Sequence, residues 1–201
     1  MSNQSQLEKL NLEMSACTKC ILRATCQRVV FGSGNPEAKI IFIGEAPGKK
    51  EDELGIPFVG STGRILDKML EGIVIKREDV YLTNLCKCRP PENRDPLPEE
   101  VTTCAYWLEK QIQIINPKII ITLGRFALNY FLPQAKISAV HGNILKINTP
   151  KIGEIKLFPL HHPAAARINR KNRTIFTQDF QKIPQILKQI KKERYELYPK
   201  K

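Results

Sequence analysis

Four short apolar runs alternate along the chain with amphipathic segments, and this alternation constrains the fold more than any other feature. The runs span residues 39–44, 80–84, 118–124 and 155–160. Between them, apolar residues recur at helical spacing over 62–71, 98–115 and 125–132. Strands that alternate with helices form parallel sheets covered on both faces. We therefore expect an α/β protein with three α/β/α layers and a central, mainly parallel, four-stranded sheet of the doubly wound kind.

Two further segments add to this pattern. Residues 5–14 predict a short helix that leads into Cys17. Residues 137–160 contain two turn-like stretches, at 141–143 and 150–153, which predict short strands. We expect an antiparallel hairpin that feeds the last core strand.

The C-terminal segment predicts a final amphipathic helix over residues 174–192, kinked or restarted at Pro184. The chain shows no internal repeat. We expect residues 1–201 to form a single domain, with a helix and a cysteine-bearing segment over 1–28 and a helix and basic tail over 174–201.

The charge of the chain indicates the kind of partner. Lysine and arginine outnumber aspartate and glutamate by 32 to 20, a formal net charge of +12, which favours nucleic acid. The alternative is a solvated, lysine-rich tail over residues 182–201. No apolar run approaches the ~20 residues that span a bilayer, and residues 1–10 are polar. We expect a cytoplasmic monomer without membrane contact.

Polar residues directly follow three of the four predicted strands. They are the loop Gly44–Gly48, the strand-end residue Asn84 and the pair His161 and His162. Singly, these residues are also typical of a turn, a strand cap and a structural histidine. Ligands of open α/β sheets bind at the carboxyl ends of the strands. Their joint placement therefore predicts a functional site at that edge, and Phe58, set between Pro57 and Gly60, is a further candidate.

In this context the sequence resembles the family 4 uracil-DNA glycosylases, from about Cys17 to Asp179. The resemblance rests on several motifs in order. They are Gly44-Glu45-Ala46-Pro47-Gly48 followed by Glu51-Asp52, Pro57-Phe58-Val59-Gly60, Thr83-Asn84, Lys87-Cys88-Arg89-Pro90-Pro91 with Asn93-Arg94, Leu123-Gly124, and His162-Pro163-Ala164.

The resemblance implies a 4Fe-4S cluster held by four of the six cysteines, Cys17, Cys20, Cys88 and Cys104. Clustered cysteines in a reducing compartment more often bind metal than form disulfides. From spacing alone, tetrahedral zinc is the competing interpretation. Cys26 and Cys86 are left over, either as buried thiols or, for Cys86, as an alternative ligand to Cys88.

The family also implies roles for the strand-end residues. Phe58 would stack on a flipped uracil, Asn84 would pair with its edge, and His162 would donate to uracil O2. The loop Gly44–Gly48 would line the uracil site with Gly44, Ala46 and Gly48. The resemblance assigns no water-activating Asp, because Ala46 stands where the best known enzymes have Asp. Glu45 and Asn93 are the candidates for positioning water.

The segment after His162 departs from the family pattern. Its usual wedge leucine is replaced, and either Arg167 or Ile168 could fill the vacated base position. The basic residues here predict phosphate contacts, with a solvated basic loop as the alternative. The predicted DNA-contacting set is Arg167, Ile168, Arg170, Lys171 and Arg173.

These observations predict a monofunctional glycosylase that acts on uracil-containing DNA, single- or double-stranded, and leaves an abasic site. A covalent offshoot of the superfamily has a histidine in the loop after the cluster cysteine, and residues 89–97 contain none. Two alternatives remain open at this point: an iron-sulfur DNA-binding accessory module that does not cut, and a glycosylase for other deaminated bases.

Overall fold

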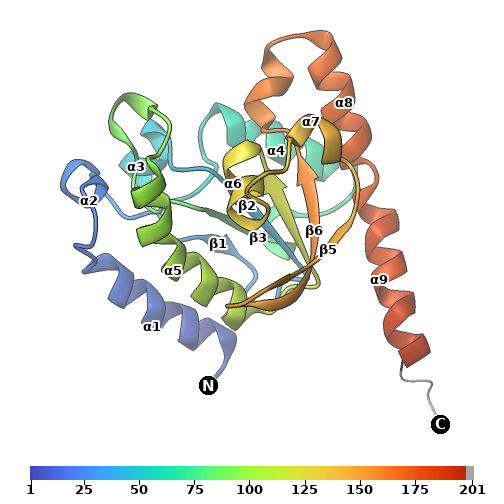
Figure 1. Ribbon diagram of the computed structural model, residues 1–201, viewed down its shortest axis with the longest axis horizontal. Helices are drawn as coiled ribbons and strands as arrows, with labels where there is room; N and C mark the ends of the chain where they lie inside the picture. The colour runs from blue at the N-terminus through green and yellow to red at the C-terminus, as the bar shows by residue number, and fades with distance from the viewer. Residues whose placement is uncertain (198–201) are drawn as a thin grey trace.

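The protein is described by a computed structural model, which places the backbone of residues 1–197 and the side chains of residues 1–190. The end of the predicted basic tail, residues 198–201, lies outside the described residues. The described chain forms one mixed sheet with helices on both faces (Figure 1). Its strands are β1 (Ser33–Gly34), β2 (Ile40–Gly44), β3 (Tyr81–Asn84), β4 (Ile119–Leu123), β5 (Leu145–Thr149) and β6 (Gly153–Leu160).

The strand order is β1-β3-β2-β4-β6-β5, and the four central strands run parallel. These four are the apolar runs of the sequence, so the parallel core is confirmed. The predicted count of four strands is wrong, because an antiparallel strand closes each edge. β1 has only two residues and no apolar pattern that could reveal it. β5 pairs with β6 through the predicted hairpin, which is confirmed.

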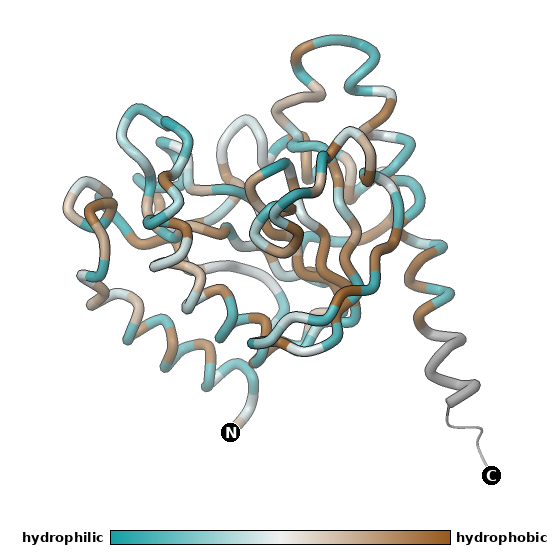
Figure 2. The backbone as a smooth tube through the Cα atoms, viewed as in Figure 1, coloured by the Kyte–Doolittle hydropathy of each residue, from teal (hydrophilic) through white to brown (hydrophobic). Residues whose placement is uncertain are grey.

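Helices cover both faces of the sheet, so the doubly wound prediction is confirmed. One face packs on α4 (Ser61–Gly72), α8 (Arg170–Phe180) and α9 (Ile183–Leu197). The other packs on α1 (Asn3–Ser15), α5 (Pro98–Ile115), α6 (Arg125–Phe131) and α7 (Ile137–Val140). The short elements are α2 (Leu22–Thr25), α3 (Lys49–Leu54), η1 (Arg77–Asp79), η2 (Pro91–Asn93) and η3 (Pro163–Arg167). The apolar strands run through the middle of these layers (Figure 2).

The helix boundaries follow local capping. Helix α5 matches its prediction, whereas the predicted C-terminal helix starts earlier, at Arg170, because the Asn169 side chain accepts from the Asn172 amide. The chain then breaks and restarts as α9, with Pro184 in the first turn, where no helical hydrogen bond is lost. Residues 137–140, expected in a strand, form helix α7 instead. None of the described helices combines the length and the apolarity of a membrane span.

Candidate active site

The carboxyl ends of β2, β3 and β6 surround a cavity of about 150 Å³. Parallel pairing aligns these ends, since Gly44 pairs with Asn84 across β2 and β3. The residues that line the cavity are Glu45, Ala46, Pro47, Gly48, Glu51, Phe58, Thr62, Asn84, Pro90, Asn93, Arg94 and His162. The structure thus brings together strand-end residues that lie more than a hundred positions apart in the chain.

The side chains of Phe58 and Asn84 both pack against the backbone of Gly44. A Cβ atom at position 44 would lie 2.4 Å from Asn84 Oδ1 and 2.7 Å from Phe58 Cζ. Only glycine allows both side chains to approach the backbone of β2 this closely. The pocket therefore has a flat aromatic wall and an amide edge that are held against each other.

Phe58 is held in an uncommon backbone conformation, with φ of 54°. The Glu51 carboxylate fixes the following residues by accepting hydrogen bonds from the amides of Val59 at 3.0 Å and Gly60 at 2.7 Å. Gly63 completes the fit, since a Cβ there would lie 1.8 Å from the Phe58 carbonyl oxygen. The ring of Phe58 is buried and also lines the cavity, so it is both a core residue and a pocket wall.

His162 is held as a neutral imidazole. Burial lowers the pKa of this side chain to about 4. The Ala164 amide donates to Nδ1 at 3.4 Å, which leaves the proton on Nε2. At neutral pH this residue can therefore donate one hydrogen bond from Nε2 without carrying charge.

Glu45 is the carboxyl group in the cavity whose pKa is raised. Burial and, to a smaller extent, the neighbouring Asp95 raise the pKa of Glu45 to about 7, although Arg125 opposes both. Ala46 beside it supplies no acidic side chain. Asn93 lies exposed at the cavity mouth, and its side-chain oxygen accepts from Arg89 at 2.8 Å. Of the two candidates for positioning water, Glu45 is thus the one that can take up a proton near neutral pH.

The residues predicted to contact DNA gather on η3 and the start of α8. Arg167 donates to the Ser61 hydroxyl at 2.9 Å, and Arg173 donates to the Ala166 carbonyl at 3.4 Å. Arg170 and Lys171 lie exposed on the first turn of α8. Ile168 is 74% exposed. All five residues therefore lie on the segment that follows His162 in the chain, although none of them lines the cavity that holds His162.

The four predicted cluster ligands lie in one buried group with Met14, Leu22 and Trp107. Burial raises the pKa of the Cys20 and Cys88 thiols, and the nearby Cys104 raises both further. Among the described residues, no group of three or more His, Cys, Asp or Glu side chains is arranged to hold a metal ion. All six cysteines are free thiols, so the donor chemistry of the group fits an all-thiolate centre.

Two charged side chains near the site, one buried and one partly exposed, were not predicted to act there. The Lys87 ammonium is fully buried and donates at 2.7 Å to Thr83 Oγ1, to the Asn84 carbonyl and to Gln111 Oε1. Its backbone amide donates to Cys104 Sγ at 3.1 Å. Lys87 therefore connects the cysteine group to the backbone of Asn84. In the sequence, Lys87 is only the first residue of the motif Lys87-Cys88-Arg89-Pro90-Pro91, and this position does not show that the side chain is buried.

Arg94 is the second such charge. It lines the cavity and forms a two-point ion pair with the buried Glu100, at 2.6 and 2.9 Å. The guanidinium holds the pKa of Glu100 below its usual range. This pair anchors the loop that carries Asn93 to the first turn of α5.

The sheet and its cavity define a doubly wound α/β protein with a strand-end site for a small, flat, polar ligand. Comparison with known proteins agrees: residues 31–188 match the family model of the uracil DNA glycosylase superfamily. The type-4 uracil-DNA glycosylase of Sulfurisphaera tokodaii is 43% identical, covering 90% of this chain and 84% of its own. The type-4 uracil-DNA glycosylase of Archaeoglobus fulgidus is 42% identical, and the match covers 90% of this chain and 92% of that protein. The type-4 uracil-DNA glycosylase of Thermotoga maritima is 40% identical, and the match covers 93% of this chain and 97% of that protein. This chain therefore belongs to the type-4 uracil-DNA glycosylases of that superfamily.

Proposed function

We propose that the protein hydrolyses the bond between uracil and deoxyribose in DNA. Water forms a bond to C1′ of the sugar while the N1–C1′ bond breaks, and its electron pair leaves with uracil and spreads onto O2. The leaving base takes up a proton, so the products are free uracil and an abasic site. The observation that carries this proposal is the convergence of Phe58, Asn84, His162 and Glu45 on one cavity.

Recognition follows from the shape and polarity of the cavity. A base must leave the stack to reach it, and the Phe58 ring offers a face on which the flipped base stacks. The Asn84 amide can donate to uracil O4 and accept from N3–H, whereas cytosine presents the opposite pattern. The neutral His162 and the backbone amides of Gly44–Gly48 can donate to O2 as charge develops there.

The proposed activity is tested with a duplex and a single strand that each contain one uracil. The protein should release free uracil, and alkali should then cut the strand at the abasic site. A protein that binds the oligonucleotide but leaves it resistant to alkali would be the accessory module instead. Release of hypoxanthine at a comparable rate would identify a broader glycosylase.

The pH dependence of the reaction tests the role of Glu45. We propose that its carboxylate accepts a proton from the attacking water. With the pKa raised to about 7, the carboxylate form is lost as the pH falls below this value. We expect the rate to fall about tenfold per pH unit on the acid side. The neutral His162 contributes no titration there, because its pKa lies near 4.

The Glu45→Gln variant provides the comparison. We expect a rate at least about 100-fold lower at pH 8, the usual contribution of a general base, and no acid limb between pH 5 and 8. Single-turnover rates across this range measure both. An unchanged acid limb in Glu45→Gln would assign the titration to another group.

We propose that Cys17, Cys20, Cys88 and Cys104 hold a 4Fe-4S cluster. The proposal is supported by their shared buried group and by the mutual influence of the Cys20, Cys88 and Cys104 thiols. When bound, the cluster supplies a cross-link between the N-terminal segment and the middle of the chain. Cys26 and Cys86 are buried thiols beside these ligands, in contact with Cys88 and Cys104 respectively.

The cluster proposal predicts a brown protein with visible absorbance and about four iron atoms per chain. Cys88→Ser should abolish this absorbance and lower the melting temperature by about 10 °C, since each lost kcal/mol shifts a domain of this size by ~2–4 °C. Cys26→Ser, a matched change at a neighbouring thiol, should retain the colour. Colourless protein that contains zinc would contradict the proposal.

We also propose a cytoplasmic setting and a monomeric state. Six free thiols, all of them in or beside the proposed ligand set, suit a reducing compartment. The sheet edge at β1 is only two residues long, which limits pairing with a second sheet. Light scattering of the purified protein measures its mass directly.

A further inference from the structure

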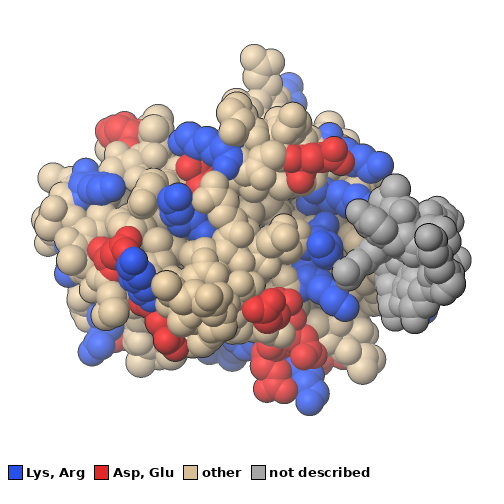
Figure 3. All heavy atoms as spheres, turned by 90° about the horizontal axis from the view of Figure 1, so that it is seen from below, with Lys and Arg blue, Asp and Glu red and all other residues tan. Residues whose placement is uncertain are grey.

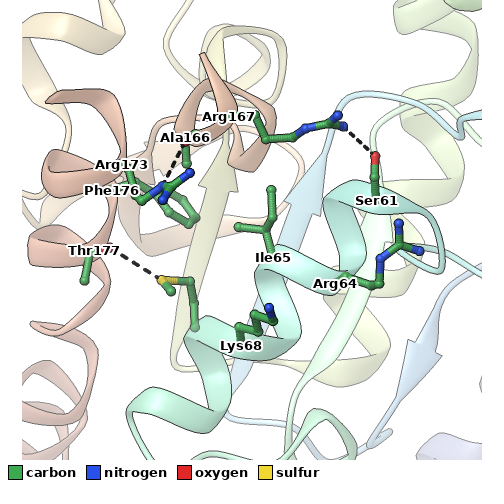
Figure 4. Close-up of a pocket in the computed structure, with 10 residues that line it drawn as sticks. Ser61, Arg64, Ile65, Lys68, Ala166, Arg167, Arg173, Phe176 and Thr177 are labelled. Carbon is green, nitrogen blue, oxygen red and sulfur yellow. Dashed lines mark hydrogen bonds between the residues drawn. The ribbon is translucent and has the colours of Figure 1, made fainter. Parts of the chain in front are cut away.

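A second and larger cavity, of about 520 Å³, lies between α4 and the η3–α8 segment. Figure 4 shows the side chains of both elements facing it. Its inner surface is apolar, formed by Ile65, Met69, Ala166 and Phe176, with Thr177 hydrogen-bonded to the Met69 sulfur at 3.8 Å. The volume falls within the ~300–1,000 Å³ of ordinary ligand sites. The cavity plays no part in the reaction described above.

Four cations surround the opening of this cavity: Arg64 and Lys68 of α4, Arg167 of η3 and Arg173 of α8. No acidic residue lines it, and none of the four cations forms an ion pair with another described residue. The face at the amino ends of the strands differs, since Figure 3 shows both signs of charge mixed there. An apolar interior with a purely cationic rim suits a ligand with a flat ring and an anionic group.

The cavity adjoins the uracil pocket through two shared segments. Helix α4 begins at Ser61, three residues after Phe58, and η3 begins directly after His162. The hydrogen bond from Arg167 to Ser61 joins these segments at the rim (Figure 4). Because Gly63 packs on the Phe58 carbonyl, the start of α4 is fixed relative to the uracil wall. A strand with its base in the first pocket therefore passes the opening of the second.

We propose that this cavity binds a nucleotide adjacent to the uracil on the same strand. Its base enters among Ile65, Met69 and Phe176, and the cationic rim neutralises the neighbouring phosphates. This nucleotide must also leave its stack, which is easier in an unpaired strand. The inference rests on the proposed glycosylase activity and names its preferred substrate as single-stranded DNA.

The test uses the wild-type protein and single-stranded oligonucleotides with one uracil. In each, one neighbour of the uracil, on the 5′ or the 3′ side, is replaced by a tetrahydrofuran abasic analogue. We expect kcat/KM to fall about 5- to 100-fold at one of these positions, the range found when a base loses its stacking partner. Equal kcat/KM for all the oligonucleotides would overturn the inference. A higher kcat/KM on the matching duplex than on the single strand would overturn the preference for single-stranded DNA.

Two variants separate this site from a general charge effect. Thr177→Phe fills the cavity, so it should lower kcat/KM on the intact oligonucleotide and remove the further loss caused by the analogue. The exposed double variant Arg64→Gln/Lys68→Gln should weaken binding and reduce its salt dependence by a slope of about 1–2. Lys118→Ala, at an exposed position just before the amino end of β4, should change neither quantity. If the losses caused by Thr177→Phe and by the analogue were additive, the inference would be overturned. If the protein released uracil from none of the oligonucleotides, the proposed function itself would be overturned.

Discussion

Replacing His162 with alanine is expected to slow uracil release about 10²–10³-fold, the usual cost of removing one donor to developing negative charge. The Nε2 proton of the neutral imidazole is the donor, because Nδ1 already accepts from the Ala164 amide. The loss should fall on kcat more than on KM, since the charge on uracil O2 develops as the bond to the sugar breaks. Single-turnover rates on a uracil-containing single strand measure it.

The adjacent histidine is the matched control. His161 does not line the cavity; its ring packs on His141, with the ring centres 4.7 Å apart. His161→Ala should therefore keep the rate within a few-fold of the wild type. The acid limb near pH 7 should survive in His162→Ala, because we assign it to Glu45. A loss smaller than tenfold, or disappearance of that limb, would show that His162 is not the neutral donor described.

The parallel core of the fold could be predicted because its cause is local. β2, β3, β4 and the second half of β6 are buried on both faces, and their sequences are therefore largely apolar. Once the strands are parallel, their carboxyl ends share one edge, so Asn84 and His162 had to lie near each other. The edge strand β1 could not be predicted, since two residues carry no periodicity.

The details that make the site work depend on contacts between distant residues. Nothing near Phe58 in the sequence reveals that Glu51 holds its loop, or that its φ is positive. Lysine is usually exposed, so the burial of Lys87 beneath Asn84 follows only from the packing of α5 on the sheet. Likewise, the helical spacing of Arg64 and Lys68 does not show that α8 lies opposite α4, or that a cavity lies between these two helices.

Replacing Asn84 with alanine is expected to lower kcat/KM for uracil about 10²–10⁴-fold. Uracil O4 and N3–H would both lose their partner inside a closed pocket, and each such loss costs about 1–3 kcal/mol. The side-chain amide packs against the backbone of Gly44, and Lys87 fixes the backbone of Asn84 by donating to its main-chain carbonyl. Alkali cleavage of a single-uracil strand, followed over time, measures the loss.

Two further variants distinguish lost hydrogen bonds from a damaged fold. Asn84→Asp keeps the size of the side chain but replaces the donor with a carboxylate oxygen facing uracil O4, so its loss should be at least as large as that of Asn84→Ala. Asn148→Ala makes the same truncation at an exposed position of β5 and should leave the rate unchanged. If Asn84→Asp retained nearly full activity, the shape of the pocket would select uracil and the amide would not, because a carboxylate cannot supply the donor that O4 requires.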